Sequence, residues 1–420
     1  AAERIPAGRS TSDSIPRAAA AIVDASADPD CTALRDYESA ITQAHKESGL
    51  GIFAPSPRAI CDPSAFSAAA AAIIRPRPDA PIERIYFETM PLSWLGSTYQ
   101  HLLAFRPDDT AESLHPTQSF RKGRGVFFTP PSLVSYIVQG VLTPLVESRN
   151  GLFSAVSRGN QQPVRILDPS VGGGDFLSGA IDFLAGGADR ETRARIAAEC
   201  VFGVDLDPLA VEISRFSVWA CSGFADGTAE SLNAHLVCGN ALGARHADEP
   251  DFDWPATFPE AFANGGFDAV IGNPPYIAAK NGLNGARASG QSDSYLMFVS
   301  EIMHNKLVRP DGLLSMVLPD PMLVRENAAE IRCKLAKEWS IVSLLHISEA
   351  FPDALVANVV PICRNSPPSG QPLRAARVEH AADRHAFLQR PWKTANDLSH
   401  PVRIETVTAQ ERCEFLYLLE

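Results

Sequence analysis

The sequence predicts a mostly parallel, doubly wound α/β domain of Rossmann-like type, preceded by a helical N-terminal region. Between residues 116 and 365, apolar runs that read as strands, such as "VRILDP", "VFGVDLD" and "FDAVIGNPP", alternate with helix-like segments. This alternation is typical of βαβ units around a parallel sheet. Residues 1–115 are rich in Ala, Ser and Pro, and helix-like stretches such as "CTALRDYESAITQAHKES" predict helices before the sheet.

Length and hydrophobicity bound the number and kind of domains. The chain has 420 residues, 45% of them hydrophobic, and no apolar run is long enough to cross a bilayer. We therefore expect no membrane association. The predicted division is a helical region over 1–115, the α/β domain over 116–365, and a linker with the start of a C-terminal region over 366–420. Since the chain lacks an initiator Met and stops inside a helix-like segment, we expect a longer parent protein.

Cysteine and charge patterns narrow the function classes. The eight cysteines form no C-x-x-C pair and no histidine lies at ligand spacing, so the sequence predicts neither a metal site nor a disulfide framework and favours a reducing cytoplasm. The net charge of −12 argues against a grip on nucleic acid by the whole surface. A single basic face would be enough to bind nucleic acid. The segments "RPRP" (75–78) and "SFRKGRG" (119–125) either contribute to such a face or are ordinary solvated surface charge.

The segment "RILDPSVGGGDFLSGAIDFLA" contains a glycine-rich turn between a strand and a helix. The strand ends at Asp168 and Pro169, the chain passes through Gly172 and Gly174, and Phe176 lies on the apolar face of the helix. Glycines here let the backbone approach a ligand closely at the carboxyl end of a strand. Because such turns bind dinucleotides, other phosphates or no ligand, this turn alone predicts only a candidate nucleotide-type site.

Two later strands end in polar residues suited to the same site. Asp205 ends the second strand, where an acid usually holds ribose hydroxyls. Asp207 is predicted to cap the next helix, with Pro208 in its first turn. Leu206 would lie against the adenine ring of the ligand, and Asn240, at the end of "HLVCGN", would hydrogen-bond the edge of that ring. The alternative is that both aspartates only cap the helix.

The stretch "FDAVIGNPPYIAAK" (267–280) predicts a rigid loop after a buried strand. A buried strand runs directly into Asn273, Pro274, Pro275 and Tyr276. Two consecutive prolines remove two backbone donors and fix φ, so the chain leaves the sheet as a stiff, extended turn. Such a turn holds an amide side chain, carbonyl groups and an aromatic ring at the end of a strand.

Four ordered motifs, "DPSVGGGDFL", "GVDLDP", "GNAL" and "GNPPY", resemble those of the S-adenosylmethionine-dependent N6-adenine DNA methyltransferases of restriction-modification and phage-defence systems, specifically the gamma class. The earlier segment "GRGVFFTPPSLVSYIV" (123–138) resembles the cofactor-cradling motif of that family. The resemblance covers about 116–365. It implies a class I methyltransferase domain that binds S-adenosyl-L-methionine and double-stranded DNA.

The resemblance also implies roles for individual residues. Phe351 would press on the target base opposite Tyr276, unless it is an ordinary core phenylalanine. Asn240 departs from the family, which commonly has an acid at this position, but an amide can still engage the cofactor adenine. The residues implied to bind the cofactor are Phe127, Phe128, Thr129, Asp168, Pro169, Gly172, Gly174, Phe176, Asp205, Leu206, Asn240 and Ala241.

The Asn-Pro-Pro-Tyr loop suits the chemistry that the resemblance implies. The N6 amine of adenine is a poor nucleophile because its lone pair is delocalised into the ring. If the Asn273 side-chain oxygen and the Pro274 carbonyl accept hydrogen bonds from this amine, they favour a pyramidal nitrogen whose lone pair points at the methyl group. Pro275 stiffens the turn, and a base rotated out of the duplex stacks on Tyr276. This mechanism requires no metal.

Other functions stay open on the sequence alone. A protein glutamine N5-methyltransferase meets the same delocalised nitrogen with an Asn-Pro-Pro-Tyr motif, but normally has no segment like "GVFFTPP" before it. A non-catalytic subunit of a defence complex would keep only the fold, and RNA adenine is a further substrate to consider. Because only about 55 residues follow the domain, we expect a specificity or nuclease module in a missing portion or a partner subunit.

Overall fold

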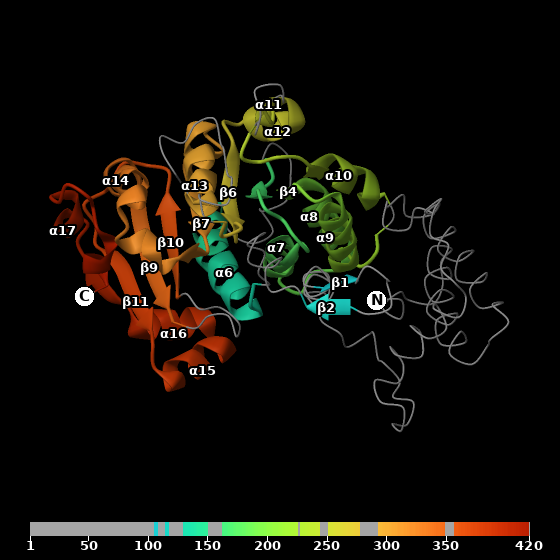
Figure 1. Ribbon diagram of the computed structural model, residues 1–420. Coiled ribbons are helices and arrows are strands. Elements are labelled where there is room, and N and C mark those ends of the chain that lie inside the picture. The colour runs from blue at the N-terminus through green and yellow to red at the C-terminus, as the bar shows by residue number, and fades with distance from the viewer. Residues whose placement is uncertain are drawn as a thin grey trace.

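A ten-stranded sheet runs through the part of the chain that the computed structural model describes (Figure 1). The described residues are 105–107, 114–116, 129–149, 162–225, 227–243, 251–277, 293–348 and 357–419. The strands of this sheet are β3 (Ile166–Asp168), β4 (Val201–Asp205), β5 (Leu236–Cys238), β6 (Phe267–Gly272), β7 (Val308–Met316), β8 (Leu318–Pro319), β9 (Ser340–Ile347), β10 (Asn358–Arg364), β11 (Leu373–Val378) and β12 (His400–Val402).

The strand order is β12-β11-β9-β10-β7-β6-β3-β4-β5, and β8 pairs with β10. All neighbours from β7 to β5 are parallel, as are β9 and β11. Strand β10 is antiparallel to both β7 and β9. The chain proceeds from β3 to β4 and β5 on one side, and then to β6 and β7 on the other. This reversal confirms the predicted doubly wound, mostly parallel sheet, and the switch point lies between β3 and β6.

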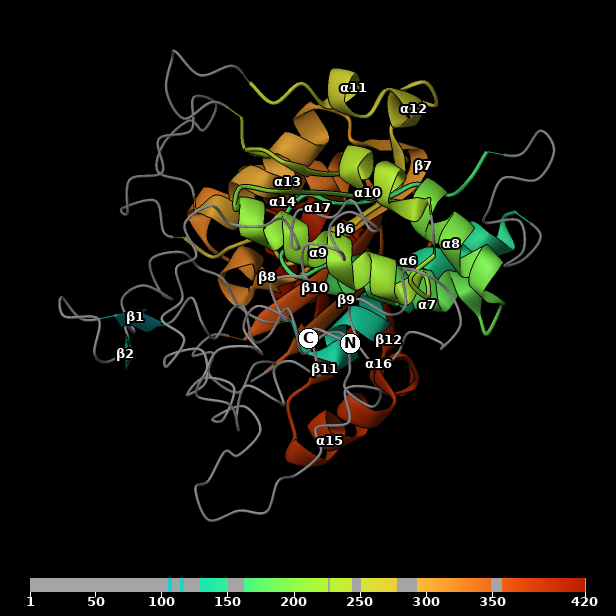
Figure 2. The same cartoon turned by 90° about the vertical axis from the view of Figure 1, so that its right-hand side faces the viewer.

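Helices cover both faces of the sheet. One layer contains α6 (Pro131–Glu147), α7 (Asp175–Ala185), α8 (Arg190–Glu199), α9 (Pro208–Cys221), α10 (Thr228–His235), α15 (Ala381–Gln389) and α16 (Pro391–Leu398). The other contains α11 (Trp254–Thr257), α12 (Pro259–Phe262), α13 (Ser294–His304), α14 (Ala329–Glu338) and α17 (Glu405–Thr408), with short 3-10 turns at Asp320–Leu323, Glu326–Ala328 and Phe415–Leu418. Figure 2 shows α7 to α10 gathered on one side of the molecule. All four of these helices contact β4.

The central strands β3, β4 and β6 are almost entirely buried because each has a helical layer on both faces. In β6, Ala269 and Ile271 pack into the core under α6 and α7, whereas Val270 packs into the core under α13 and α14. Every residue of β6 is buried, as expected for a central parallel strand. This burial gives the residues that follow β6 a rigid base.

The sheet continues beyond residue 365, where the sequence predicts the end of the domain. Strand β11 pairs in parallel with β9, and β12 pairs with β11. The Pro- and Gly-rich stretch after β10 is therefore a connection within the sheet. Of the predicted helical region, the structure describes only an antiparallel pair, β1 (Phe105–Pro107) and β2 (Leu114–Pro116), and the rest lies outside the described residues. No described helix has the length and apolar character needed to cross a membrane.

Candidate active site

The predicted motifs meet at one edge of the sheet. Asp168 ends β3, Asp205 ends β4, and Gly272 ends β6 directly before Asn273. Because β6, β3 and β4 are neighbouring parallel strands, their carboxyl ends lie side by side at the switch point. Ligands of open α/β sheets bind at this kind of place.

The glycine-rich turn brings the start of α7 close to α9. Gly174 is the N-cap of α7 with φ of 84°, in the left-handed region that glycine tolerates best. A Cβ added there would lie only 3.2 Å from the Ser214 Cα. The Gly172 N–H donates to Asp205 Oδ2 at 2.9 Å, which ties the turn to the end of β4. Glycine at position 174 thus allows α7 and α9 to pack closely beside the end of β4.

Asp205, the last residue of β4, and Asp207 have different hydrogen-bond partners. Asp205 Oδ1 accepts from the Asp207 N–H at 2.9 Å, so backbone donors hold both of its oxygens. The Leu206 N–H is a third backbone donor to this carboxylate, so one lone pair is left for a ligand. Asp207 accepts from the Leu209 N–H at 2.9 Å and caps α9, as predicted. Between them Leu206 is 52% exposed, which is unusual for a leucine and leaves its side chain available to an apolar ring.

Asp168 is buried beside the start of the Asn-Pro-Pro-Tyr loop. Its carboxylate is 1% exposed and accepts from the Ser170 N–H at 3.0 Å. Burial raises the pKa of Asp168 to about 8, and the nearby Asp205 adds to the rise. A Cβ on Gly272 would lie 2.7 Å from Asp168 Oδ1. Gly272 therefore lets an acid from β3 reach the residue next to Asn273.

The side-chain amide of Asn240, which follows β5, is hydrogen-bonded within its own loop. Asn240 Nδ2 donates to the Gly243 carbonyl, and its Oδ1 accepts from the Leu242 N–H at 3.2 Å. The side chain retains one N–H and one lone pair for a ligand. Ala241 beside it is buried in the core below this edge.

Thr129 contacts Asn273 across the site. Asn273 Nδ2 donates to Thr129 Oγ1 at 3.1 Å, although the two residues are 144 positions apart. Thr129 is buried immediately before α6. With Nδ2 directed at Thr129, the amide presents its oxygen on the opposite side. The sequence assigns Thr129 to the cofactor, whereas this contact also gives it a part in orienting Asn273.

Ser294, a residue that the sequence analysis did not single out, braces the Asn-Pro-Pro-Tyr loop. Its N–H donates to the Ile277 carbonyl at 2.9 Å, its Oγ accepts from the Ile277 N–H at 2.8 Å, and its hydroxyl donates to the Pro275 carbonyl. Ser294 begins α13 and is fully buried. A serine at a predicted helix start is a recognisable signal, but its loop partner is set by the tertiary fold.

Tyr276 is anchored by its hydroxyl. The hydroxyl donates to the Val317 carbonyl at 3.0 Å and accepts from Asn358 Nδ2 at 3.0 Å. Burial raises the pKa of Tyr276 above the ordinary tyrosine value. Its ring packs edge to face on Tyr295, with the centroids 6.2 Å apart, and the residue is half-buried. Asn358 lies at the start of β10, and the sequence analysis assigns it no role.

The remaining predicted residues differ in what the structure says of them. Phe127, Phe128 and Phe351 lie outside the described residues. The Phe176 side chain is 3% exposed and packs in the core under α6 and α7, and Pro169 is buried at the end of β3. Any contact of these two with a ligand would therefore depend mainly on the backbone around them.

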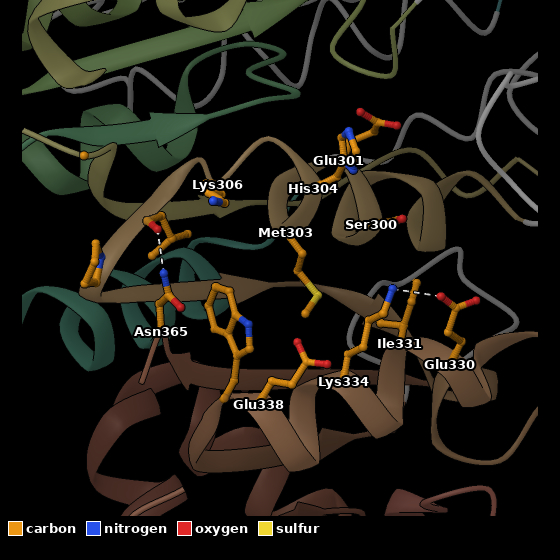
Figure 3. Close-up of a pocket in the computed structure, with 14 residues that line it drawn as sticks. Ser300, Glu301, Met303, His304, Lys306, Glu330, Ile331, Lys334, Glu338 and Asn365 are labelled. Carbon is orange, nitrogen blue, oxygen red and sulfur yellow. Dashed lines mark hydrogen bonds and ion pairs between the residues drawn. The ribbon is translucent and has the colours of Figure 1, made fainter. Parts of the chain in front are cut away.

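A crevice of 680 Å³ lies away from this edge, between α13 and α14 (Figure 3). It is bordered by Gly265 and Val308 at the amino ends of β6 and β7, the end of the sheet opposite Asn273. Its wall carries both charges, including the ion pair of Lys334 with Glu330 at 2.8 Å. Within the described ranges, His, Cys, Asp and Glu side chains form no cluster suited to a metal ion.

Comparisons with known sequences identify related proteins. Residues 199–351 match the family described as Eco57I restriction-modification methylase. The adenine-specific methyltransferase PglX of Streptomyces coelicolor is 27% identical over 221 residues, 45% of this chain and 16% of that protein. The type II methyltransferase M.CvrRI of Paramecium bursaria Chlorella virus XZ-6E is 24% identical over 206 residues, 48% of this chain and 38% of that protein. The matched part is thus less than two fifths of either relative.

Solved structures share the fold. The DrdV–DNA complex matches with a TM-score of 0.60 and 16% identity, over 96% of this chain and 40% of that chain. The type I restriction-modification methyltransferase subunit of Streptococcus thermophilus matches with a TM-score of 0.54 and 15% identity, over 95% of this chain and 79% of that chain. At such identities the likeness shows the fold alone. Together, the comparisons confirm that this chain resembles the adenine-specific methyltransferases of restriction-modification systems and has a methyltransferase α/β fold.

Proposed function

We propose that this chain is the methyltransferase part of a DNA-modifying enzyme and methylates N6 of an adenine rotated out of duplex DNA. The observation that carries the proposal is the hydrogen bond from Asn273 to Thr129 at the switch point, beside Asp168 and the glycine-rich turn. It joins the predicted catalytic amide to the segment that resembles the cofactor motif.

The residues around the glycine-rich turn fit S-adenosyl-L-methionine. Gly174 lets α7 pack closely against α9, Asp205 keeps one lone pair for a ribose hydroxyl, and exposed Leu206 offers an apolar surface to adenine. Asn240 retains one donor and one acceptor toward the ring edge. When bound, this cofactor supplies the activated methyl group.

Asn273 performs the central step by redirecting the amine of the target base. Its Oδ1 and the Pro274 carbonyl accept the two N6 hydrogens, which draws the nitrogen lone pair out of conjugation with the ring. Thr129 limits rotation of the amide, so the acceptor stays in place before the base arrives. After transfer, the nitrogen loses one proton to solvent. The chain therefore contributes position and hydrogen-bond acceptors, with no strong base.

Tyr276 supplies the surface for the target base. Its hydroxyl is fixed from two sides, so a half-buried ring of defined orientation is available for stacking. Phe351 is proposed to cover the other face of the base. Sequence recognition and any nuclease are assigned to further parts of the protein or to partner subunits, and the location proposed for the enzyme is the cytoplasm.

The proposal is tested by incubating the protein with S-adenosylmethionine carrying a labelled methyl group and unmethylated duplex DNA, followed by nucleoside analysis. We expect labelled N6-methyladenine, which Asn273→Ala abolishes while leaving cofactor binding intact. Parallel reactions contain RNA or protein substrates. Label on a glutamine amide instead of DNA would establish the protein N5-methyltransferase alternative, and cofactor binding without transfer to any substrate would favour a non-catalytic subunit.

A further inference from the structure

Asn358 is a buried amide at the active-site edge. It is the first residue of β10 and is 1% exposed. Because β10 runs antiparallel to β7, its first residue lies level with the carboxyl ends of β7 and β6. The register places Asn358 opposite Pro319 of β8 and Ile347 of β9. An element from late in the chain thus reaches the loop that follows β6.

The hydrogen bonds of Asn358 are directed at Tyr276. Asn358 Nδ2 donates to the Tyr276 hydroxyl at 3.0 Å, and this hydroxyl donates to the Val317 carbonyl at 3.0 Å. The phenol oxygen is therefore held from two directions. One hydrogen bond would leave the ring free to swing about a single contact, whereas two bonds restrict both its tilt and its position.

Packing alone would favour an apolar side chain over an asparagine at position 358. The next residues of β10 inside the sheet are Val359 and Val360, which are buried among apolar side chains. Within the part of the chain that the structure describes, Asn358 Oδ1 is buried without a hydrogen-bond partner. A buried polar atom left in this way destabilises the fold. An apolar side chain would avoid this cost but would not contact the tyrosine hydroxyl through a donor.

We propose that Asn358 is a positioning residue that sets the plane of the Tyr276 ring for the target base. This inference rests on the proposed function, in which Tyr276 stacks on the base. Asn358 acts through Tyr276 and does not contact the base or the cofactor. Its loss should therefore reduce turnover on DNA and leave the affinity for S-adenosylmethionine unchanged.

The chain offers a matched control for Asn358 at the far end of the same strand. Asn365 follows β10, and its Nδ2 donates to the Val308 carbonyl at 2.7 Å (Figure 3). It borders the crevice between α13 and α14, on the edge opposite the active site. Replacing Asn365 removes this hydrogen bond and a second one, from Nδ2 to the Arg309 carbonyl at 3.2 Å, without touching Tyr276.

The test compares Asn358→Leu with Asn365→Leu in the full chain, by methyl transfer to duplex DNA and by thermal unfolding. For Asn358→Leu we expect kcat to fall on the order of 10-fold, with no fall in Tm and an unchanged KM for S-adenosylmethionine. For Asn365→Leu we expect an unchanged kcat and a lower Tm. A loss of kcat that accompanies a lower Tm in both variants would overturn the positioning role.

A double-mutant cycle isolates the contact itself. In a Tyr276→Phe background the hydroxyl is absent, so adding Asn358→Leu should change kcat by less than about twofold. Equal losses in the two backgrounds would mean that Asn358 acts by another route. If the unaltered protein transfers no methyl group, the proposed function fails, and non-additive Tm shifts in the same cycle still decide whether Asn358 and Tyr276 are coupled.

Discussion

Asn273 donates a hydrogen bond to the Thr129 hydroxyl at 3.1 Å, so the residue before α6 orients the amide after β6. This contact predicts a difference between two small substitutions. Thr129→Val preserves shape but removes the acceptor, and we expect kcat for DNA methylation to fall roughly 10- to 100-fold. Thr129→Ser keeps the hydroxyl and should retain most of the activity. Single-turnover methyl transfer distinguishes the two variants, and equal rates would remove Thr129 from the orientation of Asn273.

Asp205 and Asp207 lie two residues apart but should respond differently to substitution. Asp205 faces the proposed ribose site, so Asp205→Ala should weaken binding of S-adenosylmethionine, on the order of 10-fold or more in Kd. Asp207 caps α9 through the Leu209 N–H. Asp207→Ala should cost about 1 kcal/mol of stability and change Kd much less. Calorimetric titration with the cofactor, together with urea unfolding, checks both. An unchanged Kd in Asp205→Ala would exclude Asp205 from the site.

The buried Asp168 predicts a pH-dependent stability. Burial raises its pKa to about 8 in the folded protein, against 3.8 for an ordinary aspartate. Between these two values the folded protein holds a proton that the unfolded chain has released, so this residue's contribution to stability falls as the pH rises toward 8.

The neutral substitution Asp168→Asn removes this titration. The free energy of unfolding of Asp168→Asn, relative to that of the unaltered protein, should therefore rise with pH. We expect this difference to increase by about 1 to 3 kcal/mol from pH 5 to pH 8. The same substitution should impair methyl transfer, because Asp168 lies beside Gly272 and the proposed cofactor site. Urea unfolding at a series of pH values measures the first effect. Parallel stability curves for the two proteins would contradict it.

Arg332 predicts a stability effect that is separate from activity. Its side chain is fully buried, and its guanidinium donates to the carbonyls of Met322, Arg325, Arg412 and Cys413. It thereby fastens the C-terminal segment to the connection between β8 and α14. Arg332→Lys replaces a planar guanidinium with a single ammonium and leaves some of these carbonyls without a donor. We therefore expect the free energy of unfolding to fall by about 2 to 4 kcal/mol. A loss in urea unfolding below about 0.5 kcal/mol would contradict this role.

Several parts of the site follow from local sequence alone. The glycine-rich turn, the acid after the second strand and the Asn-Pro-Pro-Tyr loop each follow an apolar run that forms a strand in the sheet. In a parallel sheet the carboxyl ends of neighbouring strands share an edge, so recognising the strands was enough to place Asp168, Asp205 and Asn273 together. Asp207 and Pro208 likewise mark the start of α9 through short-range capping, which depends only on adjacent residues.

Other contacts could not be predicted because they join segments far apart in the chain. Asn358 meets Tyr276 across 82 positions only because β10 returns antiparallel between β7 and β9. Around Asn358, "VANVVPIC" has the pattern of an ordinary buried strand. The stretch after residue 365 reads as a linker, yet β11 joins β9 through backbone hydrogen bonds that carry no side-chain signature.

The sequence by itself therefore determined the parallel α/β core and the residues at its strand ends, since strand burial, turns and caps are encoded within short segments. Only the tertiary structure decided how Thr129, Ser294 and Asn358 hold the Asn-Pro-Pro-Tyr loop. Their hydrogen bonds depend on strand order and on the register between distant strands, and these arise when the whole core packs.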